Sequence, residues 1–139
     1  MMCWRMIRWD CASLLCSLPL LLAGCESKPT TGSIVTANQD NFRTVVVASK
    51  QPVLVEFWSL SCEPCKQLEP HLEALARKHH ELLVVKVNAD ENQPLAEDLG
   101  VQLVPTLFVY QNGEAKRRQV GAPKPEELAE LVSAFITPK

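Results

Sequence analysis

The chain has 139 residues, which is enough for one domain. It carries 14 Lys and Arg against 16 Asp and Glu, a formal charge of -2, and 47% of its residues are hydrophobic, as in ordinary globular proteins. A mildly acidic chain without a block of basic residues has no electrostatic basis for binding nucleic acid. Nucleic-acid partners are therefore not expected.

The N-terminal segment has the pattern of a signal peptide. Arg5 and Arg8 form a short basic region, and Cys11–Ala23 is a run of small and apolar residues broken only by two serines and a proline. This run is shorter than the roughly 20 residues that a spanning helix needs. We therefore predict that residues 1–24 are a signal peptide.

The leader ends in Leu22-Ala23-Gly24-Cys25, which resembles the lipobox of bacterial lipoproteins. The resemblance implies that Cys25 becomes the lipidated first residue of the mature protein. The protein would then be lipid-anchored to the inner or outer membrane of a bacterial cell envelope, facing the periplasm or extracytoplasmic side. Residues 25–32 would form the lipidated cysteine and a flexible linker, since this stretch is rich in Ser, Thr, Pro and Gly. The alternatives are a plain secretory signal or an uncleaved anchor, with Cys25 incidental.

The cysteines do not form a disulfide framework that staples a small fold. Four of the six lie in the leader or at its edge, namely Cys3, Cys11, Cys16 and Cys25. Only Cys62 and Cys65 remain in the part of the chain that folds, and they are two residues apart. This spacing favours a functional pair. Two packing cysteines, or part of a zinc site, are the alternatives, although no second Cys/His pair lies at ligand spacing.

The first half of the domain, which we place at residues 33–139, alternates strands and helices. Ser33–Thr36 predicts a short strand, and Phe42 with the following valines predicts a helix. Val53–Trp58 is nearly all apolar, which is typical of a central strand covered on both faces. An amphipathic helix should run from Cys65 to about His79 or His80, and Pro70 inside it should cause a kink.

The second half ends in a hairpin. Leu82–Val87 predicts a strand, and Pro94–Leu99 predicts a short helix. Two further strands are joined by an Asn-Gly turn, and a last helix follows; their ranges are Thr106–Tyr110, Lys116–Val120 and Glu126–Ile136. The order predicts an α/β fold with parallel strands early and an antiparallel hairpin late.

The domain resembles thioredoxin in several motifs that occur in the same order and at the same spacing. They are Val55-Glu56-Phe57-Trp58, Cys62-Glu63-Pro64-Cys65-Lys66, Pro70, Lys86-Val87-Asn88, Val104-Pro105-Thr106, Asn112-Gly113 and Gly121. The resemblance implies a thioredoxin fold, in which helices flank a central mixed sheet. It also implies a redox-active Cys62–Cys65 disulfide and no other cofactor or metal.

The position of the two cysteines suits thiol-disulfide exchange. A thiolate attacks a disulfide, so the first cysteine needs a stabilised charge and an exposed sulfur. At the start of a helix, free backbone amides and the positive end of the dipole would face Cys62. We therefore expect Cys62 to be the nucleophile and Cys65, on the same helical turn, to resolve the mixed disulfide.

The resemblance assigns further residues to the site. It implies that the Val104–Pro105 peptide is cis, that Pro105 lies against the disulfide, and that Val104 offers backbone hydrogen bonds to the substrate. Pro64 and Gly121 would complete the substrate-binding surface.

Glu56 takes the place of the buried aspartate of thioredoxins. The resemblance implies that it relays a proton to and from Cys65, with Lys86 as its partner. The alternative is a strand glutamate that reaches the surface. The three histidines, His71, His79 and His80, are expected to be solvated at the helix surface or end.

The sequence departs from thioredoxin beside the cysteines, since Ser61 and Glu63 replace a tryptophan and a glycine. The negative charge of Glu63 disfavours a thiolate at Cys62 and should make the dithiol less oxidising than one with His there.

Together these features predict a membrane-anchored, extracytoplasmic thiol-disulfide oxidoreductase that reduces protein disulfides as a monomer. Its electrons would come from a membrane thiol reductase. Net oxidation of substrate thiols is the alternative among enzymes, and a non-catalytic thioredoxin-like binding or chaperone module is the alternative outside them.

Overall fold

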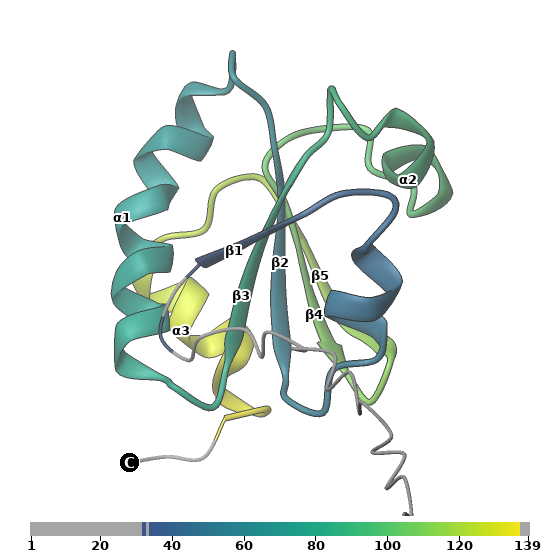
Figure 1. The fold of residues 1–139 in the computed structure, drawn as a ribbon. Helices are drawn as coiled ribbons and strands as arrows, with labels where there is room; N and C mark the ends of the chain where they lie inside the picture. Colours follow the sequence, from purple (N-terminus) through teal and green to yellow (C-terminus); the bar gives the residue numbers. More distant parts are fainter. Residues whose placement is uncertain (1–31, 33, 137–139) are drawn as a thin grey trace, which may run out of the picture.

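The structure is a computed structural model that describes residue 32 and residues 34–136. The predicted signal peptide, the lipobox with Cys25 and most of the linker lie outside the described residues. One five-stranded sheet organises the domain (Figure 1). Its strands are β1 (Ile34–Ala37), β2 (Val53–Trp58), β3 (Leu83–Asn88), β4 (Thr106–Gln111) and β5 (Glu114–Val120).

The sheet is mixed, with the strand order β1-β3-β2-β4-β5. Strands β1, β3 and β2 are parallel, whereas β4 runs antiparallel to β2 and β5 antiparallel to β4. The turn between β4 and β5 contains Asn112 and Gly113, both with positive φ (54° and 82°), as a tight hairpin turn requires. The predicted order of parallel strands and a final hairpin is confirmed.

In the part of the chain that the structure describes, four helices cover the two faces of this sheet. They are η1 (Arg43–Val47), α1 (Glu63–Lys78), α2 (Gln93–Asp98) and α3 (Pro125–Ser133). In Figure 1, α1 and α3 lie on one side of the sheet, and η1 lies on the other. The helix predicted around Phe42 is present, as the π-helix η1. The helical assignment of α1 continues without a break through Pro70.

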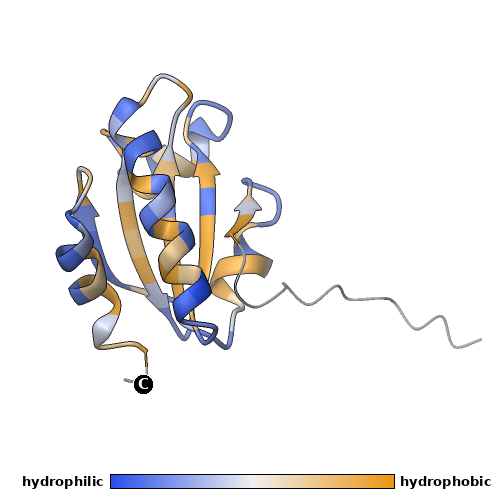
Figure 2. Ribbon diagram, turned by 90° about the vertical axis from the view of Figure 1, so that its left-hand side faces the viewer, coloured by the Kyte–Doolittle hydropathy of each residue, from blue (hydrophilic) through white to orange (hydrophobic). Residues whose placement is uncertain are grey.

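Side chains that alternate along β2 enter two separate apolar cores. Val53, Val55 and Phe57 face η1 and join one core, whereas Leu54 faces α1 and α3 and joins the other. Because side chains alternate along a strand, Glu56 shares the face of Leu54 and points under α1. Figure 2 shows the hydrophobic inner strands behind α1, whose outer side is hydrophilic. The central strand therefore carries a carboxyl group into a core.

Helix α3 ends at Ser133, three residues before the predicted end. The apolar periodicity continues beyond it because Phe135 and Ile136 still pack against the same core. The backbone there forms a turn, in which the Phe135 N–H donates to the Val132 carbonyl at 2.9 Å. Apolar spacing predicted the contacts correctly and the helix end wrongly.

The prediction of solvated histidines is correct for His71 and His80 and wrong for His79. His79 is buried at the C-terminal end of α1, where its N–H donates to the Leu75 carbonyl (2.9 Å) and its ring lies 3.4 Å from Glu81. The helix ends here and the chain turns back toward β3, with the Leu82 N–H donating to the His79 carbonyl at 3.0 Å. Among the described residues, no helix has both the length and the apolar character needed to cross a membrane.

Candidate redox site

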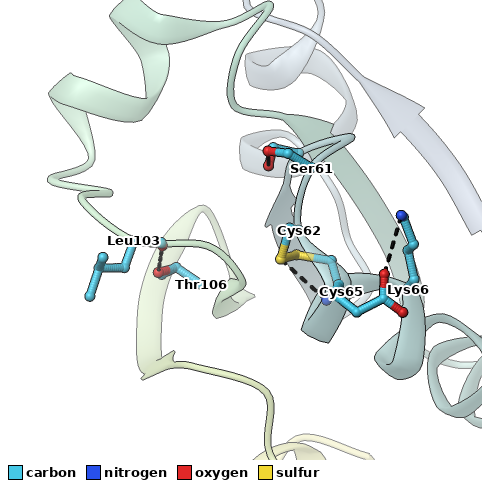
Figure 3. The surroundings of a disulfide bond; sticks show 8 residues. Ser61, Cys62, Cys65, Lys66, Leu103 and Thr106 are labelled. Atoms are coloured by element: carbon cyan, nitrogen blue, oxygen red, sulfur yellow. Dashed lines mark hydrogen bonds and ion pairs between the residues drawn. A yellow bond between two sulfur atoms is a disulfide. The ribbon is translucent and has the colours of Figure 1, made fainter.

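Cys62 and Cys65 form a disulfide at the start of α1, with 5.3 Å between their Cα atoms. Cys62 is the residue that caps the helix, and its sulfur accepts a hydrogen bond from the Cys65 N–H at 3.2 Å (Figure 3). Pro64 occupies the first turn, where a missing backbone donor costs nothing. The pair is thus a disulfide rather than two separate packing cysteines, and its sulfurs are not free to bind zinc in this state.

Both cysteines are largely enclosed. Cys62 is 7% exposed and Cys65 is 3% exposed, so Cys62 is the more accessible of the two. The sequence predicted an exposed sulfur at Cys62, whereas this residue is buried. Its N–H donates to the Ser59 carbonyl at 3.2 Å, which folds the preceding turn against it. Figure 3 places the loop from Leu103 to Thr106 in the surroundings of the disulfide as well. The expectation of an exposed Cys62 is therefore corrected.

The charge of Glu63 is balanced by a neighbour one turn along the helix. Its carboxylate pairs with the Lys66 ammonium at 3.3 Å, and both side chains are well exposed. Exposed pairs of this kind contribute about 0–1 kcal/mol. Lys66 therefore offsets part of the negative charge that Glu63 places beside Cys62.

The Val104–Pro105 peptide is cis, as the sequence resemblance implies. The carbonyl of Pro105 accepts a hydrogen bond from the Gly121 N–H at 2.8 Å, and Gly121 has a positive φ of 85°. The Thr106 hydroxyl donates to the Leu103 carbonyl at 2.6 Å and closes the loop before β4. The antiparallel pairing of β4 with β5 thus brings Pro105 and Gly121 together at the open end of the hairpin.

Glu56 is fully buried at the centre of β2. Within the described residues, neither of its carboxyl oxygens has a hydrogen-bond partner. Burial raises the pKa of this carboxyl from 4.5 to about 7, while the charge of Lys86 lowers it and the charge of Glu69 raises it. The alternative of a strand glutamate that reaches the surface is wrong.

The predicted pairing of Lys86 with Glu56 needs correction. The two residues are register neighbours on β3 and β2, but the Lys86 ammonium forms its ion pair with Glu69 at 2.7 Å. It also lies 4.6 Å from the centre of the Trp58 ring. Lys86 turns toward α1 because a carboxylate there offers both a charge and access to solvent, which the buried Glu56 does not.

The resemblance to thioredoxin assigns no role to Glu69. Its side chain is 46% exposed, yet it reaches over the edge of the helix to Lys86. A lysine in an otherwise apolar strand needs a charged partner, and this was the signal that could have led to Glu69. Leu60 and Leu103 were also missed; they are 69% and 67% exposed, one on each of two loops near the disulfide.

Metal ligands do not gather at this site. Across residue 32 and residues 34–136, no group of three His, Cys, Asp or Glu side chains could hold a metal ion.

A family model described as thioredoxin matches residues 33–134 of the chain. The chain belongs to the thioredoxin family.

Thioredoxins from bacteria and chloroplasts are among its relatives. The thioredoxin of Streptomyces clavuligerus is 42% identical over 91 residues, which cover 66% of this chain and 85% of that protein. The thioredoxin of Haemophilus influenzae is 36% identical over 104 residues, covering 74% of this chain and 97% of that protein. The chloroplastic M-type thioredoxin of Zea mays is 33% identical over 113 residues, covering 81% of this chain and 68% of that protein. The chain thus spans about two thirds of the length of this chloroplast relative.

Solved structures agree with these similarities. A mutant thioredoxin from Halobacterium salinarum superposes with a TM-score of 0.72 at 30% identity, covering 81% of this chain and 98% of that chain. The short form of thioredoxin f from spinach chloroplast gives a TM-score of 0.72 at 29% identity, covering 78% and 97% of the two chains. The predicted thioredoxin fold is confirmed.

Membership of the thioredoxin family defines the activity at a general level. The protein is a thioredoxin-like thiol-disulfide oxidoreductase, and its Cys62–Cys65 disulfide is the redox centre. Thioredoxins use this disulfide without an external cofactor and act on disulfides of other proteins.

Proposed function

We propose that this protein is a lipid-anchored thioredoxin that faces the extracytoplasmic side of a bacterial membrane and reduces disulfides of other proteins. The observation that carries the redox part is the Cys62–Cys65 disulfide at the start of α1, with the cis Val104–Pro105 peptide in the adjacent loop. The anchoring part rests on the leader sequence and Cys25. Delivery of electrons by a membrane thiol reductase, and a monomeric state, belong to the same proposal.

The reaction begins with the reduced protein. The Cys62 thiolate attacks one sulfur of the substrate disulfide, forms a mixed disulfide, and releases the other substrate sulfur as a thiolate. Cys65 then loses its proton to the Glu56 carboxylate and attacks the Cys62 sulfur. This step closes the Cys62–Cys65 disulfide and releases the second substrate thiolate. Two electrons pass to the substrate, and the two thiolates take up protons.

Helix α1 favours the first step. Cys62 caps the helix, so the backbone N–H of Cys65 already points at its sulfur at 3.2 Å. In the reduced protein the same N–H and the positive end of the helix dipole would stabilise the Cys62 thiolate. Cys65 lies deeper, which keeps it protonated until the mixed disulfide has formed.

The loops beside Cys62 form the proposed substrate surface. Val104 and Pro105 lie on one side, Gly121 is bonded to Pro105, and Pro64 is exposed at the start of the helix. The exposed side chains of Leu60 and Leu103 add apolar area to this end of the molecule. A substrate segment with apolar residues near its disulfide would fit such a surface, because burying these leucines releases water.

Insulin reduction tests the proposed activity. With dithiothreitol as the electron source, the purified protein should accelerate precipitation of the insulin B chain, whereas protein alkylated after reduction should not. Absence of thiol-dependent turnover would refute the enzyme. The direction of electron flow follows from the redox potential: a value near about -270 mV supports a reductant, and one near about -120 mV supports an oxidant.

Lipid attachment is a separate prediction. Replacing Cys25 with alanine should leave the protein without lipid, because the acceptor sulfur is missing. Fatty-acid labelling and membrane fractionation of bacteria that express each form measure this, and Cys16→Ala is the matched control inside the leader. Unchanged labelling and unchanged membrane retention in Cys25→Ala would contradict the lipobox.

A further inference from the structure

The ion pair between Glu69 and Lys86 joins α1 to the middle of β3. The Glu69 oxygen lies 2.7 Å from the Lys86 nitrogen, and the ammonium also lies 4.6 Å from the centre of the Trp58 ring. The Lys86 side chain is 12% exposed, whereas that of Glu69 is 46% exposed. The almost buried Lys86 ammonium thus contacts the carboxylate of Glu69 on α1 and the ring of Trp58 at the end of β2.

Glu56 is the other carboxyl within reach of this lysine. The two residues are register neighbours, and both point to the face of the sheet that α1 covers. Glu56 is fully buried, and among the described residues neither of its oxygens has a hydrogen-bond partner. A buried carboxylate needs a paired cation to offset the cost of leaving water. Here the ammonium is already taken by Glu69.

Glu69 and Lys86 both line an open cavity. It has a volume of about 660 Å³, and its charged lining consists of Glu69, Glu73, Arg77 and Lys86, next to Trp58. Both members of the pair line this cavity, whereas the buried Glu56 does not. The ion pair with Glu69 holds the Lys86 ammonium at this cavity.

We propose that Glu69 is a positioning residue for the proton relay: it holds the Lys86 ammonium at the cavity, so that the Glu56 carboxyl has no ionic partner and can exchange its proton with Cys65. This inference rests on the proposed role of Glu56. A carboxylate in a salt bridge would be a weaker base toward the Cys65 thiol, because the ammonium stabilises its charged form.

The electrostatics of the site agree with this geometry. Burial raises the pKa of Glu56 to about 7, Lys86 lowers it, and Glu69 raises it. These two charges come from β3 and α1. The groups that β4 and α3 add to the same core are apolar, namely Leu107, Val109, Leu128, Leu131 and Val132. Burial is therefore the main cause of the raised pKa of Glu56, and Lys86 and Glu69 are the two charges that adjust it in opposite directions.

Titration of Glu56 in the oxidised protein tests the inference. The protein is labelled with ¹³C at the glutamate side-chain carboxyls, and the Glu56 signal is the one missing from Glu56→Gln. Glu69→Gln should lower the titration midpoint of Glu56 by about one pH unit, since a negative charge is lost and Lys86 is released toward Glu56. An unchanged midpoint would overturn the proposal.

Two controls separate positioning from a general charge effect. Glu73 lies on the same helix, lines the same cavity and pairs with Arg77 rather than Lys86. Glu73→Gln should therefore leave the Glu56 midpoint where it is, and an equal shift in both variants would refute a specific role of Glu69. In a Lys86→Met background, the effect of Glu69→Gln should shrink. A full-size shift there would show that Glu69 does not act through Lys86.

The titration does not depend on turnover, so its failure differs from a failure of the proposed function. If Glu56→Gln reduces insulin at the wild-type rate, the relay is refuted, while the Glu56 midpoint still reports on Glu69. If the relay holds, the pH profile of insulin reduction should move down by the same amount in Glu69→Gln. A profile that stays in place despite a shifted midpoint would overturn the link to catalysis.

Discussion

Replacing Cys65 with serine should stop the reaction at the covalent intermediate. Cys62 would still attack a substrate disulfide, but no second thiol would be present to displace the substrate, so the mixed disulfide should accumulate to about one substrate per chain. Insulin reduction should fall to the uncatalysed rate. Mass spectrometry after incubation with an oxidised substrate protein measures the adduct, which dithiothreitol should release.

Cys62→Ser is the matched control for this trapping experiment. It should also lose all turnover, but it should form no adduct, because Cys65 is 3% exposed and lies behind the capping residue of α1. Equal adduct formation by the two variants would contradict the assignment of Cys62 as the attacking sulfur. An adduct only in Cys62→Ser would reverse the two roles.

The stability of the oxidised protein should fall as the pH rises from 4.5 to 7. The pKa of Glu56 is raised from 4.5 to about 7 in the folded state, so the folded state binds the proton more tightly than the unfolded state. The stabilisation that the Glu56 proton provides is fully present below the pKa of Glu56 in the unfolded state. It is lost as the pH rises through the pKa of Glu56 in the folded state. The difference amounts to about 3 kcal/mol in the free energy of unfolding. Denaturant unfolding at pH 4.5 and at pH 8 measures it.

Glu56→Gln should remove this dependence, because the amide stays neutral throughout the range. Between the two pH values, the free energy of unfolding of the variant should fall by about 3 kcal/mol less than that of the wild type. Glu97 is exposed on α2, so Glu97→Gln is the control that should keep the wild-type dependence. A fall of equal size in the wild type and in Glu56→Gln would show that another group is responsible.

The inner strands and most helices were predictable from their apolar pattern, whereas the exposed strand β5 was predictable only from the turn before it. Val53–Trp58 reads as a covered strand from its composition alone, and the observed bounds of β2 are the same. The Asn112-Gly113 turn was equally clear, since few other residue pairs accept positive φ at both positions. The end of α3 was missed because Phe135 and Ile136 keep the apolar spacing after the helix has stopped.

Burial was harder to predict than secondary structure. His79 has a polar side chain at the end of a helix, a place where solvent exposure is the usual outcome. Here the chain reverses at this residue toward β3, and the ring becomes buried beside Glu81. Cys62 is enclosed for a similar reason, because the neighbouring turn and a loop from a distant part of the chain lie around it.

The sequence by itself determined the redox pair, the helix start at which it lies, and the carboxyl group within the central strand. These features depend on residues close together in the chain, so spacing and composition are enough to identify them. Only the tertiary structure decided which charge Lys86 meets. Glu56, Glu69 and Lys86 come from three different elements. The packing of α1 against β3 places Glu69 where it forms the ion pair with Lys86. An ion pair depends on distances across the fold, which a local pattern in the sequence does not encode.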